Sequence, residues 1–150
     1  IEHGAMIAKA DGWNGAHIYL EPKNSSVGAT VNIMMAATLA NGTTTIENAA
    51  REPEVVNLAE FLTKMGAKVA GAGTSTIVIE GVEELHGAEH SVYNDRIEAG
   101  TYLAAVGIAG GDVTVRGLSP SHLPVFLDKL SEAGLFIQTG HDWIRASKTK

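Results

Sequence analysis

The chain has 150 residues, of which 45% are hydrophobic and 19% are charged, a composition that is typical of a folded protein. Its formal net charge is −6 and its 11 Lys and Arg residues form no run, which argues against nucleic acid as a partner. The chain has no cysteine, which excludes a disulfide framework, a thiolate metal site and a cysteine nucleophile within it.

The first half of the chain predicts a β-α-β-α-β-β order of elements. One helix is expected to begin at Glu52-Pro53 and end at Gly66, because its apolar residues recur at helical spacing and Pro and Gly mark its two ends. A glycine-rich turn at 71–73 is expected to join the last two strands. The remaining elements are strands at 17–20, 43–47, 67–70 and 76–80 and a helix at 27–40.

The second half repeats this order, which predicts tandem α/β repeats. Gly42 and Gly66, which end the helices of the first copy, recur at nearly the same offset as Gly111 and Gly134. Residues 6–10 resemble the closing hairpin of a preceding copy. Repeats of this kind bury their faces against neighbouring copies. The expected elements are a strand near 91–93, a helix at 97–109, a strand at 112–116, a helix ending at Gly134 and strands at 135–139 and 143–146.

The first residues of the chain resemble neither a signal peptide nor a natural N-terminus. Residues 1–3 contain neither a basic region nor an initiator Met, so we expect an internal segment of a longer protein. The longest apolar stretch, residues 33–40, is far shorter than the ~20 residues of a membrane span. We therefore expect a cytoplasmic protein with no membrane partner.

The segment before the first helix is the most informative candidate site. A helix that begins here offers unpaired backbone N–H groups and the positive end of its dipole to an anion. Lys23 adds a charge, the serine hydroxyls can donate, and Gly28 lets a ligand approach the backbone. The alternative is that a serine only caps the helix. The candidate binding residues are Lys23, Asn24, Ser25, Ser26, Val27 and Gly28.

Two further charged groups lie at helix starts. Arg51, Glu52 and Glu54 open the second helix, where carboxylates either bind a substrate hydroxyl or complement the helix dipole. Asp95 and Arg96 open the third helix, where Asp95 and a Glu three residues later fit a capping box. The histidines are scattered, so we expect no metal site and no cofactor.

Several of these runs resemble the enolpyruvyl transferase family, and within it the UDP-N-acetylglucosamine 1-carboxyvinyltransferases. The resemblance covers nearly the whole chain in order, and its longest run is highly specific. The matching runs are residues 26–30, 32–40, 46–54, 66–67, 71–74, 79–82 and 95–101.

The resemblance implies an inside-out α/β barrel of two lobes, each built from three β-α-β-α-β-β units around buried helices. Residues 1–93 are then the end of the catalytic, nucleotide-sugar-binding lobe, and residues 94–150 are the start of the second lobe. The implied reaction transfers enolpyruvyl from phosphoenolpyruvate to the 3-hydroxyl of UDP-N-acetylglucosamine with release of phosphate. It is the first committed step of peptidoglycan synthesis, and links the protein to cell-wall biogenesis, cell shape and cell division.

The resemblance also implies roles for the candidate residues. Ser26, Val27 and Gly28 match the family's Lys-x-Ser-Val-Gly segment and would hold the uridine diphosphate group, with Lys23 or Asn24 at the lysine position. The charged residues 51, 52, 54, 95 and 96 would line the cleft between lobes.

The family's catalytic residues lie outside this segment. Its general acid, usually a cysteine on a mobile loop, is expected upstream, and a catalytic aspartate downstream. We therefore predict that the isolated chain is inactive. Two alternatives stay open. One is an enzyme like 3-phosphoshikimate 1-carboxyvinyltransferase, although the signature residues of that enzyme differ from residues 46–54. The other is a non-catalytic α/β repeat module.

Overall fold

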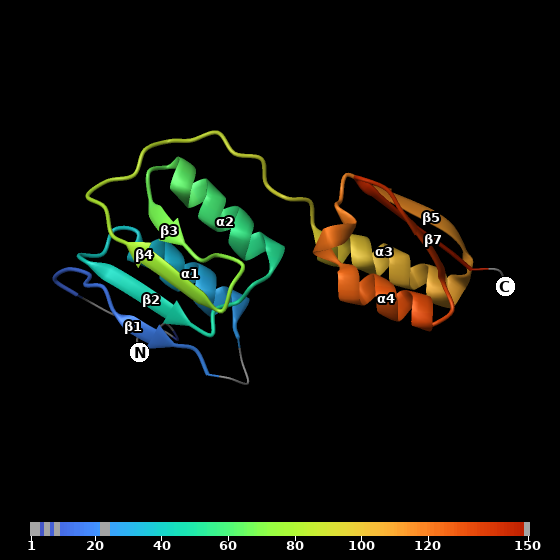
Figure 1. The fold of residues 1–150 in the computed structure, drawn as a ribbon, viewed down its shortest axis with the longest axis horizontal. Helices are drawn as coiled ribbons and strands as arrows, with labels where there is room; N and C mark the ends of the chain where they lie inside the picture. Colours follow the sequence, from blue (N-terminus) through green and yellow to red (C-terminus); the bar gives the residue numbers. More distant parts are fainter. Residues whose placement is uncertain (1–3, 5–6, 8–9, 22–24, 149–150) are drawn as a thin grey trace. The chain divides into compact units, whose positions relative to one another are not determined.

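The computed structural model describes residue 4, residue 7 and residues 10–21 and 25–148. The chain divides into two compact units, Ile1–Ser91 and Val92–Lys150. Each unit has its own strands and its own helices (Figure 1). Each unit also has its own buried core. The mixed α/β class predicted from the sequence is confirmed, while the barrel that further repeats would build stays a prediction.

The first unit contains a four-stranded sheet in the order β1-β2-β4-β3. Strand β1 is parallel to β2, and the two other pairings, β2 with β4 and β3 with β4, are antiparallel. Along β4, residues alternate between buried and exposed, so the sheet has one core face and one solvent face. The strands are β1 (His17–Tyr19), β2 (Thr43–Glu47), β3 (Lys68–Ala70) and β4 (Thr76–Glu80).

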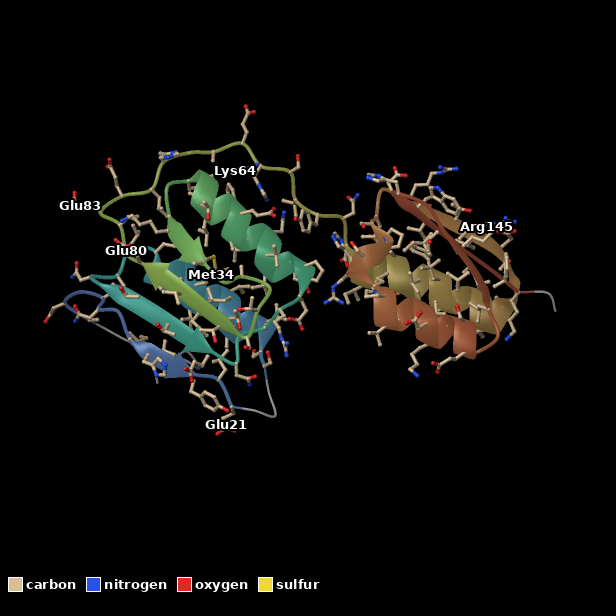
Figure 2. All side chains as sticks on the ribbon, in the orientation of Figure 1. Glu21, Met34, Lys64, Glu80, Glu83 and Arg145 are labelled. Carbon is tan, nitrogen blue, oxygen red and sulfur yellow. The ribbon has the colours of Figure 1, made fainter. Side chains whose placement is uncertain are left out.

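Two helices, α1 (Val27–Ala37) and α2 (Pro53–Lys64), supply the rest of the first core. Pro53 occupies the first turn of α2, and Gly66 follows its end with a φ of 101°, a backbone conformation that favours glycine. Met34 of α1, labelled in Figure 2, is fully buried. The core consists of Met34, Ala37, Ile46, Ala49, Ala50, Val55, Ala59, Leu62, Ala67, Ile77 and Ile79.

The second unit has a three-stranded antiparallel sheet in the order β5-β7-β6. This order matches β2-β4-β3 of the first unit, as the repeat predicts. The core is formed by Ala99, Leu103, Val106, Leu118, Leu123, Leu127, Leu135, Ile144 and Ala146. The elements are α3 (Arg96–Ala109), β5 (Gly111–Arg116), a 3₁₀ turn (Pro120–His122), α4 (Pro124–Glu132), β6 (Phe136–Thr139) and β7 (Trp143–Lys148).

The prediction of a strand near residues 91–93 is wrong. Residues 81–95 form no helix or strand, and Val92 is 80% exposed. The backbone carbonyl of Ser91 accepts a hydrogen bond from the side chain of Asn57 instead of joining a sheet. β2 has β1 along its outer edge, whereas among the described residues β5 pairs only with β7.

Other boundaries differ by a few residues. The first helix ends at Ala37 and not at Ala40, and the chain then turns. The hydroxyl of Thr38, which follows the helix, donates to the carbonyl of Met35. The hairpin expected at residues 6–10 falls mostly on residues outside those described. Among the helices of the described residues, none has the length and apolarity to cross a membrane.

Candidate functional site

The candidate residues of the first unit lie at one edge of its sheet. Residues 25–28 follow the carboxyl end of β1, and residues 51–54 follow the carboxyl end of β2. Because β1 and β2 are parallel neighbours, the segments that leave them emerge at the same edge. Such edges are where open α/β sheets bind ligands. We call the two segments together the helix-start edge.

Hydrogen bonds hold the helix-start edge together, and one of them is buried. Thr30, which is fully buried in α1, accepts a hydrogen bond on Oγ1 from the backbone N–H of Ala50 at 3.0 Å. Asn48 donates from Nδ2 to the carbonyls of Leu20 and Glu21, each at 3.1 Å. Its φ of 55° is a left-handed conformation that Asn adopts more readily than most residues. These bonds fix the loop before α2 against the loop before α1.

Ser26 caps α1, as one of the two sequence interpretations predicts. Its Oγ accepts a hydrogen bond from the N–H of Ala29 at 3.1 Å, and its backbone is extended. The N–H groups of Val27 and Gly28 have no acceptor within the helix, because they belong to its first turn. A Cβ built on Gly28 would meet only Ser26 Oγ, at 3.9 Å, so the backbone is open there. Capping and anion binding are therefore compatible at this helix start.

The second charged group surrounds the start of α2. Arg51 and Glu54 are exposed, whereas Glu52 is partly buried and occupies the cap position. The Oε2 atom of Glu52 is buried and has no hydrogen-bond partner among the described residues. A carboxylate oxygen in that state can accept a hydrogen bond from a ligand hydroxyl.

Asp95 and Arg96 belong to the second unit. Asp95 caps α3, accepting on Oδ1 from the N–H groups of Ile97 at 2.7 Å and Glu98 at 3.1 Å. This agrees with the capping interpretation of the sequence. Arg96 begins α3 and borders the apolar hollow described next. The predicted cleft between lobes stays a prediction, and so do the roles of both residues in it.

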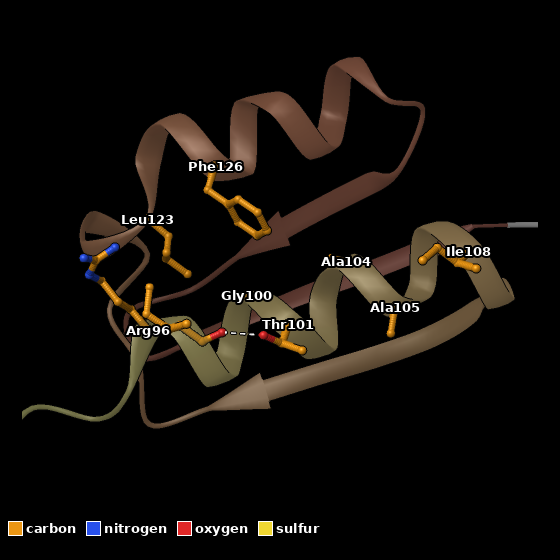
Figure 3. A pocket seen from close by; sticks show the side chains of 9 residues that line it. Arg96, Gly100, Thr101, Ala104, Ala105, Ile108, Leu123 and Phe126 are labelled. Carbon is orange, nitrogen blue, oxygen red and sulfur yellow. Dashed lines mark hydrogen bonds between the residues drawn. The ribbon is translucent and has the colours of Figure 1, made fainter.

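An apolar hollow of about 530 Å³ lies between α3 and α4 (Figure 3). Gly100 allows the Phe126 ring to approach α3, since a Cβ at Gly100 would lie 3.2 Å from that ring. Ile97 and Ile108 on α3 are 60% and 93% exposed. Helix α3 is apolar on nearly every side, which is typical of a helix buried inside a larger protein.

Lys23 and Asn24 lie outside the described residues, so which of them fills the lysine position stays open. Sequence reasoning missed Thr30 and Asn48. A Thr in a first turn carries no distinctive signal, but an Asn directly after a strand is a recognised turn residue. Among the described residues, no group of three His, Cys, Asp or Glu side chains is arranged to hold a metal ion.

Comparison with known proteins shows which protein family the chain belongs to. A family model described as EPSP synthase (3-phosphoshikimate 1-carboxyvinyltransferase) matches residues 1–150. The chain therefore belongs to this family, which confirms the resemblance to the enolpyruvyl transferases.

Two individual proteins similar to this chain differ in their sequence identity to it. The chain is 53% identical over 150 residues to a UDP-N-acetylglucosamine 1-carboxyvinyltransferase of Vibrio parahaemolyticus. The aligned region covers 99% of this chain and 35% of that protein. The crystal structure of the enolpyruvyl transferase NikO from Streptomyces tendae matches 81% of the chain and 30% of its own, with 27% identity and a TM-score of 0.71. The chain thus spans about a third of these relatives.

Proposed function

We propose that the chain is part of an enzyme that transfers enolpyruvyl from phosphoenolpyruvate to the 3-hydroxyl of UDP-N-acetylglucosamine and releases phosphate. The observation that carries the proposal is the 53% identity with the Vibrio parahaemolyticus protein of that name, which extends over 99% of the chain. In the cell the reaction is the committed step of peptidoglycan synthesis, in the cytoplasm, and it supports cell-wall growth, cell shape and division.

The helix-start edge is the proposed nucleotide-sugar site. The N–H groups of Val27 and Gly28, the dipole of α1 and the hydroxyl of Ser26 favour the uridine diphosphate group. Lys23, Asn24 and Ser25 precede this helix and complete the proposed site. The buried Oε2 of Glu52 is a candidate acceptor for a hydroxyl of the ligand.

The remaining charged residues have a proposed positioning role. Arg51 and Glu54 flank Glu52 at the helix-start edge, and Asp95 and Arg96 open α3. In the longer protein we place all of them in the cleft that receives both substrates. Residues 1–93 then belong to the nucleotide-sugar-binding lobe and residues 94–150 to the other lobe.

Further repeats of the longer protein are the proposed partners of α3. Its exposed isoleucines and the hollow beside Phe126 expose apolar surface to water, which costs about 25 cal/mol per Å² relative to burial. Packing against neighbouring repeats removes that cost. The isolated 150-residue chain is proposed to lack transferase activity, because the catalytic residues of the family are expected elsewhere.

A second candidate is transfer of enolpyruvyl to a shikimate phosphate. The description of the matching family model favours it, because that model carries the name of the shikimate enzyme. The two candidates share the donor and the fold, and they differ in the acceptor.

Phosphate release by the longer protein that carries this chain distinguishes the candidates. Phosphoenolpyruvate is supplied alone, with UDP-N-acetylglucosamine, or with shikimate 3-phosphate. Release only with the nucleotide sugar supports the proposal, and release only with the shikimate phosphate supports the second candidate. A folded protein that releases phosphate with neither acceptor rejects both. The 150-residue chain is assayed in parallel, and turnover by it rejects the proposed inactivity.

A further inference from the structure

The end of the first unit, residues 82–91, contains no helix or strand but is fixed to the unit at several points. We call it the terminal segment; it runs past α2 in Figure 1. The N–H of Val82 donates to the carbonyl of Thr38 at 2.8 Å. The N–H of His86 donates to the carbonyl of Met65 at 2.9 Å. The segment is therefore held by individual contacts, each of which can be broken without unfolding a strand or helix.

The last of these contacts centres on Asn57, a side chain of α2 that is only 5% exposed. Its Nδ2 lies 2.8 Å from Nε2 of His90 and 3.3 Å from the carbonyl oxygen of Ser91. The imidazole of His90 also stacks on Phe61 of α2, with ring centroids 5.3 Å apart and an interplanar angle of 22°. One amide group thus anchors two consecutive residues of the terminal segment.

The donor and acceptor roles of these atoms follow from the arrangement of the Asn57 amide. A carbonyl oxygen can only accept, so the Asn57 atom that faces Ser91 is the nitrogen. The same NH₂ group faces Nε2 of His90, so in this arrangement Nε2 is the acceptor and carries no proton. A neutral imidazole carries its one proton on the other nitrogen, and Nδ1 is buried without a hydrogen-bond partner among the described residues.

We propose that the contact between Asn57 and His90 is a proton-sensitive latch that holds the terminal segment on α2 only while His90 is neutral. A charged imidazole places an N–H against the NH₂ of Asn57. Asn57 can offer its Oδ1 instead only by turning its amide, which removes Nδ2 from the Ser91 carbonyl. Either way one of the two hydrogen bonds is lost. The Phe61 ring accommodates both states, because a cation is also stable on an aromatic face.

The charges near the latch are exposed and screened by solvent. On α2, Glu54 lies about one turn before Asn57 and Glu60 about one turn after it. Lys64 lies about one turn after Phe61. The three charged residues are exposed. In the terminal segment itself, Glu89 precedes His90 and is exposed. His86, another titratable residue of this segment, is exposed as well. Charges on exposed side chains are screened by water and salt.

Nitrogen-15 NMR of histidine rings in the longer protein that carries this chain tests the proposal directly. The variant His90→Gln assigns the His90 signals by their disappearance. At pH 8 we expect the neutral tautomer with the proton on Nδ1. A proton on Nε2 at that pH overturns the proposal, because Nε2 then donates and cannot accept from Asn57.

Cleavage after Glu89 by a glutamate-specific protease tests the release. The measured quantity is the cleavage rate of the native protein divided by that of Asn57→Leu at the same pH. This ratio should rise about fivefold from pH 8 to pH 5.5, because losing one hydrogen bond costs about 1 kcal/mol. The leucine variant lacks the latch, and its digest cancels the pH dependence of the protease. Asn57→Asp offers only acceptors to His90, so its cleavage should fall at the lower pH. A native-to-leucine ratio that stays constant between the two pH values overturns the proposal.

Discussion

The hydroxyl of Thr30 accepts a hydrogen bond from the backbone N–H of Ala50, and both residues are fully buried. This bond joins the first turns of α1 to the loop that precedes α2. It therefore holds the proposed phosphate-binding helix start against the charged residues 51–54. Without it, a buried N–H would lack its acceptor.

We predict that Thr30→Val lowers the free energy of unfolding by about 1–3 kcal/mol, the usual cost of leaving a buried donor unsatisfied. Urea unfolding measures the change. Thr63→Val is the matched control, because its hydroxyl bonds only to the carbonyl of Ala59 in its own helix. The control should change stability by less than about 0.5 kcal/mol. Equal effects in the two variants would contradict the role assigned to Thr30.

Substitution of Ser26 separates capping from ligand binding. Replacing a capping serine with alanine costs about 1 kcal/mol, whereas glycine at a cap costs only a few tenths. If the hydroxyl also binds the diphosphate, Ser26→Gly should weaken binding of UDP-N-acetylglucosamine to the longer protein about tenfold with nearly native stability, as for a hydrogen bond to a charged group. Calorimetric titration measures the affinity. Native affinity in Ser26→Gly would leave the serine with a capping role alone.

Gly81 is expected to tolerate no side chain, although its place after β4 resembles an ordinary strand end. A Cβ there would lie 1.6 Å from the carbonyl oxygen of Ala40, which is backbone and cannot move aside. We predict that Gly81→Ala destabilises the protein by at least about 3 kcal/mol, in the range of the severest single substitutions. Gly87→Ala is the control, since nothing lies within 4 Å of its Cβ. Thermal unfolding should show a near-native midpoint for the control only.

The sequence predicts the local parts of this structure well, because they depend on local signals. The periodicity of residues 53–66 and the glycines that follow the helices predict α2 and its end, and the serine at position 26 predicts a cap. The strand expected near Ser91 fails because Asn57, far away in sequence, binds that residue's carbonyl. The bond between Thr30 and Ala50 escapes prediction for the same reason, since tertiary packing alone brings the two residues together.

The ion pair between Asp112 and Arg145 should respond to acid. The hydrogen bond from Arg145 lowers the pKa of Asp112 below its ordinary 3.8, and the positive charge acts in the same direction. A carboxyl whose pKa is lowered by folding stabilises the fold above its ordinary pKa, and this contribution is lost as the pH falls through the lowered value. The stability difference between the native protein and Asp112→Asn should therefore be present at pH 7 and be lost as the pH falls below 3.8 and through the lowered pKa of Asp112.

Acid and salt titrations of the unfolding midpoint measure this difference. The side chains of Arg145 and Asp112 are 43% and 48% exposed, so solvent screens the pair. The effect should therefore be small and should shrink further in 1 M salt. A difference between native protein and Asp112→Asn that grows as the pH falls below 3.8 would contradict the assigned sign.

Ile108 distinguishes a helix that faces water from one that other repeats cover. It is 93% exposed in this chain, on a helix that is apolar on nearly every side. In the 150-residue chain, Ile108→Ala should change the free energy of unfolding by less than about 0.5 kcal/mol, as at other exposed positions. In the longer protein, where we propose that neighbouring repeats bury α3, the same substitution should cost about 2–5 kcal/mol.

Urea unfolding of both proteins, each with and without the substitution, provides the comparison. Val125→Ala on α4, where the valine is 70% exposed, controls for the loss of an exposed apolar side chain. If Ile108→Ala is as mild in the longer protein as in the short chain, α3 is not buried there. The packing of further repeats around it would then be rejected, while the assignment of the chain to its family would stand, because that assignment rests on sequence similarity over residues 1–150.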